Sequence, residues 1–301
     1  MSDSSQVILI TGASSGIGAA LAQVLADRYM GIRLVLAARN QERLNHVADR
    51  CSKAGAQVLI VPTDMTQIEQ VTALTQAAID RFGRVDVLVN NAGYGQMGPI
   101  ELVPIDNVQR QFQVNVLGVI ALIQTLIPIM RNQGGGKIIN VSSLAGKIAF
   151  PFCSLYSASK FALESLSDSL RRELEPFNIR VSVVEPGPVS TDFFEVVNRE
   201  VDRTMPDASS SPYRAAFAKL EDLDKLTKRQ AWTSEQVAMV IVKAITAKKP
   251  RPRYVAATAG DFTVFMMTKV LPTWVVDRFW QRFYGIDRVA KDWKTQQLNN
   301  P

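Results

Sequence analysis

The sequence predicts a doubly wound α/β fold, in which a parallel sheet carries helices on both faces. Short aliphatic and β-branched runs alternate with longer segments of helical periodicity, and these segments are long enough for the crossovers between parallel strands. A cluster of glycines directly follows the first aliphatic run, where such a sheet passes from its first strand into its first helix. We therefore expect a single domain built on one sheet.

Aliphatic runs mark the expected strands, and helical segments separate them. Helices are expected at residues 19–29, 67–82 and 107–131, because their apolar residues recur with helical spacing. The glycines at 134–136 then end the third of these helices. The expected strands lie at residues 7–10, 34–36, 58–61, 85–89, 138–141 and 181–184.

The chain of 301 residues is expected to consist of a sheet domain and an extension. Residues 1–256 form the domain, and residues 257–301 form a C-terminal helical extension. Within the domain, residues 190–230 lose the alternation of strands and helices and carry many charges, which indicates an irregular or helical insertion. Such insertions often cover a binding site, and we expect this one to cover the substrate.

The composition is that of an ordinary globular protein, with 47% hydrophobic and 21% charged residues. The net charge is +6, but the densest basic stretch, residues 248–253, contains no aromatic residue. We expect a solvated turn before a strand there, and no nucleic-acid partner. The polar amino terminus shows no export signal, and the two cysteines lack metal-ligand spacing, which favours a cytoplasmic protein without a bound metal.

Residues 262–284 are rich in Phe, Met and Trp but are interrupted by charged residues and by Pro272. They cannot span a bilayer unaided, since a spanning helix needs about 20 mostly apolar residues. The mixture of bulky apolar and basic side chains is compatible with peripheral contact between a helix and a membrane surface. A helix packed on the domain or on a partner subunit is the alternative, and both stay open.

A candidate phosphate-binding loop, TGASSGIG at residues 11–18, lies between the first expected strand and helix. Glycines let a loop approach a pyrophosphate closely, and the helix amino terminus adds backbone donors and a favourable dipole. The placement between a strand and a helix is the context that this mechanism requires. The candidate cofactor-binding residues are Gly12, Ser14, Ser15, Gly16, Ile17 and Gly18.

The pattern TGxxxGxG resembles the short-chain dehydrogenase/reductase family, as does the motif NNAG at residues 90–93. The resemblance implies a Rossmann-type domain at residues 1–256 that binds a dinucleotide and carries out catalysis. It implies that Asn91, Ala92 and Gly93 shape the adenosine side of the cofactor pocket. Asp64 matches a family position that contacts the adenine ring, although an aspartate before a helix can also be a cap or turn residue.

The end of the second expected strand indicates which dinucleotide is bound. An acidic residue there would bind the ribose 2′-hydroxyl of NAD and would repel the 2′-phosphate of NADP. This chain has Ala38 at the family position that is usually acidic in NAD users, and Arg39 follows it. Because a guanidinium can clamp a phosphate, we expect NADP(H) as the cofactor.

Tyr156 and Lys160 are the candidate catalytic pair. Their spacing of four residues places the phenol and the ammonium on one helix face. We expect the ammonium to lower the Tyr156 pKa, so that the phenol can donate and accept a proton. Ser143 lies thirteen residues before Tyr156, which is the family's spacing, and its hydroxyl would stabilise charge on the substrate oxygen.

Further site residues follow from the resemblance alone. Asn115 falls where the family places the asparagine that completes a catalytic tetrad and supports a proton-relay water. The motif PGPV resembles the family motif near the nicotinamide end of the cofactor. From this motif and the threonine after it, the implied cofactor contacts are Pro186, Gly187, Val189 and Thr191.

The sequence thus favours an NADP(H)-dependent oxidoreductase that interconverts a carbonyl and an alcohol of a small molecule. A serine hydrolase is disfavoured, because the only histidine, His46, lies in a polar helical stretch. A β-ketoacyl carrier-protein reductase and a non-catalytic NADP(H)-sensing protein stay open. The Phe, Met and Trp content of the extension favours a lipophilic ketone or aldehyde. The resemblance implies a homodimer or homotetramer.

Overall fold

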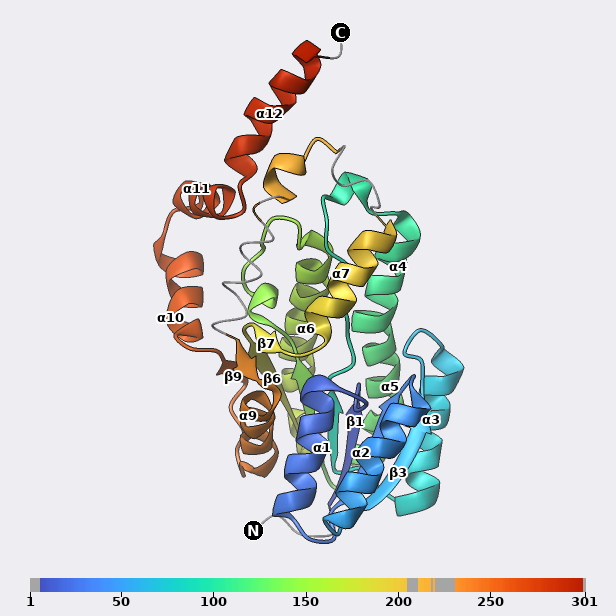
Figure 1. The fold of residues 1–301 in the computed structure, drawn as a ribbon. Helices are drawn as coiled ribbons and strands as arrows, with labels where there is room; N and C mark the ends of the chain where they lie inside the picture. Colours follow the sequence, from blue (N-terminus) through green and yellow to red (C-terminus); the bar gives the residue numbers. More distant parts are fainter. Residues whose placement is uncertain (1–5, 205–210, 218, 220–230, 300–301) are drawn as a thin grey trace.

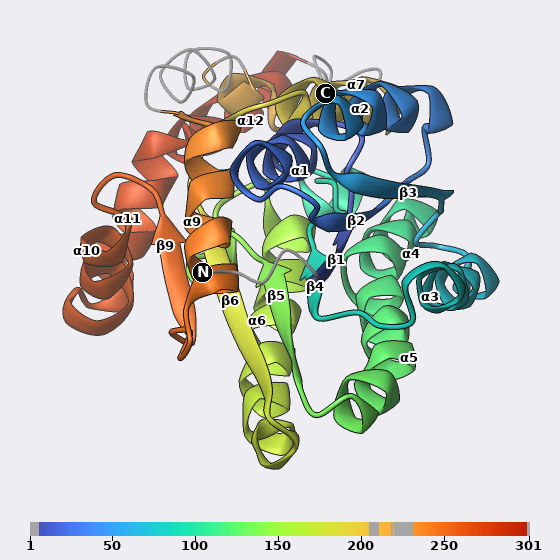
Figure 2. The same cartoon turned by 90° about the horizontal axis from the view of Figure 1, so that it is seen from below.

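A computed structural model describes residues 6–204, 211–217, 219 and 231–299 (Figure 1). Within these residues the main sheet has seven strands, all parallel, in the order β3-β2-β1-β4-β5-β6-β9. Helices cover both of its faces (Figure 2). The predicted doubly wound α/β fold is therefore confirmed.

All six expected strands are present, with boundaries that differ by a few residues from the expected ones, and a seventh follows the basic turn at 248–252. The strands are β1 (Val7–Thr11), β2 (Arg33–Ala38), β3 (Gln57–Pro62), β4 (Val87–Asn90), β5 (Gly136–Val141), β6 (Ile179–Pro186) and β9 (Arg253–Ala256). Two further short strands, β7 (Val189–Ser190) and β8 (Trp232–Thr233), pair with each other beside the main sheet.

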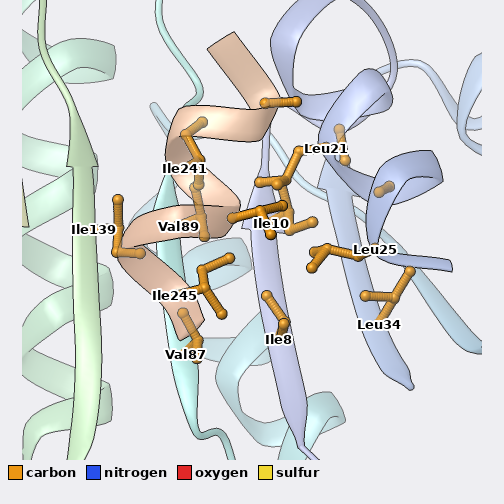
Figure 3. Packing of buried hydrophobic residues seen from close by; sticks show 14 of the residues in the cluster. Ile8, Ile10, Leu21, Leu25, Leu34, Val87, Val89, Ile139, Ile241 and Ile245 are labelled. Atoms are coloured by element: carbon orange, nitrogen blue, oxygen red, sulfur yellow. The ribbon is translucent and has the colours of Figure 1, made fainter. Parts of the chain in front are cut away.

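Alternation along the strands divides the core into two layers, because successive side chains point to opposite faces. Ile8 and Ile10 pack against α1 (Gly16–Arg28), α2 (Gln41–Lys53) and α9 (Ser234–Thr246), as Figure 3 shows in part. Val7 and Leu9 pack on the other face. The helices of that face are α3 (Ile68–Phe82), α5 (Gly118–Asn132) and α6 (Ser154–Glu173).

A long helical run carries the chain from the site region down the second face. It consists of α4 (Ile105–Phe112), a π-helical turn (Gln113–Leu117) and α5. In the described part of the chain, the helical run Ile105–Asn132 alone is long enough for a membrane span and contains an 18-residue window that is apolar enough, with a mean hydropathy of 1.9. Leu122 and Leu126 of this run are fully buried against the sheet and its neighbouring helices. Because 39% of the apolar window is buried, core packing accounts for part of its apolar composition.

The sheet order creates the binding crevice. β1 lies between β2 and β4, so the chain winds outward from β1 in both directions and the connections at its carboxyl end diverge. A crevice forms outside the strand ends at such a switch point. The residues that follow β1 and β4, Gly12 and Asn91, therefore meet there.

The described parts of the insertion and of the extension lie above the carboxyl ends of the strands or beside them (Figure 1). Of the insertion expected at 190–230, residues 193–204 form α7 (Phe193–Thr204), and residues 205–210, 218 and 220–230 lie outside the described part. The extension after β9 is helical within the described residues. It comprises α10 (Gly260–Phe265), a π-helical turn (Met266–Val270), α11 (Thr273–Phe283) and α12 (Ile286–Asn299).

Replacement of Ile8 by alanine is expected to lower the free energy of unfolding by about 2–5 kcal/mol, because it removes fully buried methyl groups and leaves a cavity. Ile100 is 59% exposed, so Ile100→Ala is the matched control and should cost less than about 1 kcal/mol. Equilibrium unfolding in urea measures both variants. Equal losses would contradict the core assigned to Ile8.

Candidate active site

The loop between β1 and α1 forms a cradle that requires glycine. Gly12 has a positive φ of 66°, which residues with side chains rarely adopt. A Cβ atom at Gly18 would lie 2.3 Å from the Gly12 carbonyl oxygen. The backbone therefore passes closely over the start of α1, where first-turn N–H groups and the helix dipole attract an anion.

Hydrogen bonds fix this loop to the end of β4. Thr11 Oγ1 accepts from the N–H groups of Asn91 and Ala92, at 3.0 Å each. In return, Asn91 Nδ2 donates to the carbonyl oxygens of Thr11 and Gly12, at 3.0 and 3.2 Å. The NNAG motif thus holds the two strand ends together and shapes the cradle.

The cradle opens into a cleft of about 2290 Å³, and its chemistry fits a dinucleotide. Ser15 is the N-cap of α1, yet its side chain makes no capping hydrogen bond, and the first turn has no acidic residue. A phosphate would therefore meet no competing carboxylate in the first turn of this helix. Gly18 is buried beneath the loop, whereas the other predicted loop residues line the cleft: Gly12, Ser14, Ser15, Gly16 and Ile17.

The residues predicted to determine the preference for NADP(H) lie at the adenosine end of the cleft. Arg39 is exposed at the carboxyl end of β2 and lines the cleft beside Ala38. Asp64 also lines the cleft, and its Oδ1 accepts hydrogen bonds from the N–H and the hydroxyl of Thr66, at 2.9 Å each. Asp64 thus has the local turn role that its sequence position allowed. Its implied contact with adenine stays a prediction.

Sequence reasoning missed Arg43, which lines the cleft at the same end. Its N–H donates to Asn40 Oδ1 at 2.9 Å, which caps α2. Its guanidinium pairs with Asp192 at 3.1 Å and so joins α2 to the segment that leads into α7. The available signal was an arginine in the first turn of the helix after Arg39.

Tyr156 and Ser143 meet in the middle of the cleft, at the carboxyl end of β5. Their side chains are hydrogen-bonded to each other, and both line the cleft. Ser143 Oγ also accepts from the Ala145 N–H at 3.1 Å and donates to the Pro186 carbonyl oxygen at 3.4 Å. The serine thereby connects the phenol with the PGPV segment.

Burial, and not Lys160, dominates the proton affinity of the phenol. Desolvation raises the pKa of Tyr156 to about 12, and the hydrogen bond with Ser143 offsets only part of this effect. The expectation that Lys160 lowers the Tyr156 pKa is therefore wrong for this structure. Lys160 Nζ lies 5.8 Å from the centroid of the Tyr156 ring and donates to the Val141 carbonyl oxygen at 2.8 Å.

Lys160 is buried but lines the cleft. Burial lowers the pKa of its ammonium group to about 8, and the negative charge of Glu164 opposes this shift. At pH 7 the ammonium is therefore still mostly charged. It lies on the same helix face as Tyr156, as the spacing predicted.

Asn115 is buried in the π-helical turn and does not line the cleft. Its Nδ2 donates to the Tyr94 carbonyl oxygen at 3.0 Å and to Ser159 Oγ at 3.1 Å. Its Oδ1 accepts from the Tyr94 N–H at 3.2 Å. The amide thus ties the segment after NNAG to α6, the helix that carries Tyr156 and Lys160.

The remaining predicted residues also lie on the cleft. Asn91, Ala92 and Gly93 form its wall at the end of β4. The Thr191 methyl group would lie 3.2 Å from a Cβ atom at Gly16, so the segment after β6 approaches the loop closely. The four predicted residues of this segment, Pro186, Gly187, Val189 and Thr191, all line the cleft.

Aromatic side chains line the part of the cleft around Tyr156. The Phe150 and Trp280 rings pack edge to face with centroids 4.8 Å apart, and the Tyr156 and Phe193 centroids are 5.5 Å apart. One side of α11 thus faces the cleft, so part of residues 262–284 packs on the domain. The helical spacing of Trp280, Phe283 and Tyr284 could have indicated this. Besides Tyr156, Tyr94 and Trp232, the aromatic lining residues are Phe150, Phe152, Phe193, Phe217, Trp280, Phe283 and Tyr284.

Comparison with known proteins agrees with this architecture. The chain is 34% identical to human 17-beta-hydroxysteroid dehydrogenase type 1 over 82% of this chain and 76% of that protein. It is 32% identical to the 3-ketodihydrosphingosine reductase of Bacteroides thetaiotaomicron, over 81% of this chain and 85% of that protein.

A solved short-chain dehydrogenase/reductase from Burkholderia phymatum, in complex with NAD, superimposes with a TM-score of 0.75. It is 31% identical, and the match covers 87% of this chain and 92% of that one. The family model for short chain dehydrogenases matches residues 6–202. The chain is therefore an oxidoreductase of the short-chain dehydrogenase/reductase family, to which it belongs by sequence and by fold.

Proposed function

We propose that the protein interconverts a lipophilic ketone or aldehyde and the corresponding alcohol, with NADP(H) as cofactor and Tyr156 as general acid and base. The observation that carries this proposal is the hydrogen-bonded pair of Ser143 and Tyr156. The pair lies between a cradle suited to phosphate and a wall of aromatic side chains. Such a cleft can hold a dinucleotide and an apolar substrate side by side.

Tyr156, Ser143 and Lys160 have separate roles in the proposed reaction. With a pKa of about 12, the Tyr156 phenol carries its proton at neutral pH and can donate it to a carbonyl oxygen during reduction. Ser143 donates a hydrogen bond to the same oxygen and stabilises the charge that develops there. Lys160 places a positive charge beside them. A nicotinamide cofactor, when bound, would supply or accept the hydride.

The direction of the pH dependence follows from the same pKa. Reduction needs the protonated phenol, which persists up to strongly alkaline pH. Oxidation of an alcohol needs the phenolate, whose fraction rises as pH increases towards about 12.

Asn115 holds α6 in place through Ser159 and the Tyr94 backbone, and we propose that this support fixes the catalytic geometry.

The preference for NADP(H) rests on charge at the end of β2. Ala38 offers no carboxylate to bind the ribose 2′-hydroxyl, and the exposed Arg39 side chain lines the adenosine end of the cleft. A guanidinium there stabilises a 2′-phosphate by charge-assisted hydrogen bonds. Arg43 adds a second cation next to it, although Asp192 partly neutralises that charge.

The lipophilic substrate class is supported by two kinds of observation. Aromatic side chains from several separate segments of the described chain line the cleft, and apolar walls favour apolar ligands. The steroid and the ketosphingoid named for the two relatives are lipophilic as well. The alternative enzymatic function is that of a β-ketoacyl carrier-protein reductase. A β-ketoacyl thioester should therefore be included among the substrates that are assayed.

Substitution of Tyr156 by phenylalanine is expected to reduce turnover by a factor of roughly 10²–10⁴, because the proton donor is lost while the ring and its packing remain. NADPH oxidation with a panel of steroid, sphingoid, retinoid and small carbonyl compounds measures this. Tyr29→Phe, outside the cleft, is the matched control. Wild-type rates in Tyr156→Phe would refute its role, and tight NADPH binding without turnover in the wild type would favour a sensor.

Substitution of Arg39 by aspartate is expected to weaken NADPH binding by roughly 10–100-fold or more and to leave NADH binding much less affected. A charge-assisted hydrogen bond of about 1.5–3 kcal/mol is lost, and a repulsive carboxylate replaces it. Fluorescence titration with both nucleotides gives the two dissociation constants. Arg28→Asp, on the exposed end of α1, is the control. An unchanged preference for NADPH would contradict the role of Arg39.

We also propose a cytoplasmic homodimer or homotetramer with peripheral membrane contact. The described cysteines, Cys51 and Cys153, are buried free thiols, which suits a reducing compartment. Leu117 and Phe161 are large exposed apolar residues on the helices that carry Asn115 and Tyr156, and these helices suit the packing of subunits. Enzymes of this family are commonly oligomeric.

The membrane contact is proposed for the outer side of residues 262–284. While one side of α11 lines the cleft, Phe262, Phe265 and Trp274 are exposed. Lys269, Arg278 and Arg282 lie in the same segment. Bulky apolar and basic side chains together favour the interface of an anionic bilayer.

Vesicles test this contact. The protein is expected to float with vesicles that contain phosphatidylglycerol, and to float less with pure phosphatidylcholine or at high salt, because salt screens the basic residues. Trp274 is 72% exposed and Met30, just after α1, is 83% exposed. Trp274→Glu should abolish flotation and Met30→Glu should not. Equal flotation of the two variants would contradict the proposed surface.

A further inference from the structure

The segment that leads into α7 joins the adenosine end of the cleft to Tyr156. Asp192 pairs with Arg43 of α2 at 3.1 Å, and the next residue, Phe193, packs on the Tyr156 ring with centroids 5.5 Å apart. All four residues line the cleft. A change in the partner of Arg43 can therefore reach Tyr156 through two adjacent residues.

Asp192 occupies the N-cap position of α7. It directly precedes Phe193, the first residue of the helix, and its carbonyl oxygen accepts the first helical hydrogen bond, from the Val196 N–H at 2.9 Å. The carboxylate of an aspartate at this position normally accepts from the free N–H groups of the first turn. Here it accepts from Arg43 Nη1 at 3.1 Å instead, and the described residues offer it no other partner.

The ion pair of Arg43 and Asp192 is open to competition from a phosphate. Arg43 lines the same end of the cleft as Arg39, where we propose that the 2′-phosphate of NADP(H) binds. The two paired side chains are 57% and 52% exposed, and such pairs contribute little to stability. A phosphate carries more charge and more acceptor oxygens than a carboxylate. It can therefore take Arg43 from Asp192, and it would repel the carboxylate that remains.

We propose that Asp192 exchanges partners when the 2′-phosphate of NADP(H) binds: it releases Arg43 to the phosphate and caps the first turn of α7. This inference rests on the proposed preference for NADP(H). Each charged group keeps a partner during the exchange, and the new cap stabilises α7. NAD(H), which has no 2′-phosphate, leaves the ion pair in place. Asp192 thus makes the stability of α7, and with it the position of Phe193 against Tyr156, depend on which dinucleotide is bound.

Asparagine at position 192 tests the competition for Arg43, because Asn is a good N-cap residue without charge. Asp192→Asn is expected to tighten NADPH binding by roughly 2–5-fold, as the loss of an exposed ion pair implies, and to leave NADH binding unchanged. In an Arg43→Gln background the same substitution should have no effect, because the contested cation is gone. Fluorescence titration with both nucleotides measures the four dissociation constants of each cycle.

Glu195→Gln is the matched control for charge alone. Glu195 is an exposed acidic residue in the first turn of the same helix, and it also lines the cleft. Its substitution should leave the ratio of NADPH to NADH affinity unchanged. Equal shifts in Asp192→Asn and Glu195→Gln, or NADPH affinity in Asp192→Asn that is unchanged or weaker, would overturn the exchange.

Hydrogen exchange tests the cap without turnover. Adenosine 2′,5′-bisphosphate and adenosine 5′-monophosphate differ only in the 2′-phosphate. The bisphosphate is expected to slow amide exchange in the first turn of α7 by roughly 3–10-fold relative to the monophosphate, since a cap opposes fraying. In Asp192→Ala this difference should vanish although the bisphosphate still binds. Equal protection by the two nucleotides in the wild type would contradict the cap.

The exchange and the proposed cofactor fail in different ways. If the wild type binds NADPH no more tightly than NADH, the preference for NADP(H) is wrong and the exchange falls with it. If the wild type prefers NADPH and Arg39→Asp removes that preference, but Asp192→Asn changes nothing, the cofactor assignment stands and the exchange alone is overturned.

Discussion

The structure depends on the junction between the ends of β1 and β4. Thr11 and Asn91 hold these ends together by four hydrogen bonds between side chains and backbone. The junction leaves so little space that a Cβ atom at Gly18 would overlap the Gly12 carbonyl oxygen. Because α1 starts directly beneath this junction, its amino terminus faces the cleft, and the remaining strand ends place the other site residues around the same opening.

Burial then decides the electrostatics of α6, the helix that carries Tyr156 and Lys160. Tyr156 and Lys160 are both desolvated, and desolvation favours the neutral form of each group: it raises the pKa of the phenol and lowers that of the ammonium. The charge behind Lys160 is supplied by Glu164, and Arg253 on the edge strand β9 links Glu164 to Glu185. The last strand of the sheet thus contributes to the environment of Lys160.

The fold and most of the cleft could be predicted from the sequence because their signals are local. Strands and helices follow from the period of apolar residues, and the glycine loop, NNAG and YxxxK motifs each place their residues within one turn or loop. Alternation in β1 even divides the core, since Ile8 and Val7 must point to opposite faces. Local spacing is retained on folding, so these assignments needed no knowledge of distant contacts.

Tertiary structure alone decided the features that join distant segments. The Tyr156 pKa depends on burial by the surrounding structure, which spacing to Lys160 does not report. The aromatic wall brings Phe150 and Trp280 together. Arg253 of β9 lies between Glu164 of α6 and Glu185 of β6. The sequence determined which groups are available and where each helix face points. Their desolvation and mutual distances arise only when segments that are distant in the sequence pack together, because both depend on three-dimensional proximity and not on order along the chain.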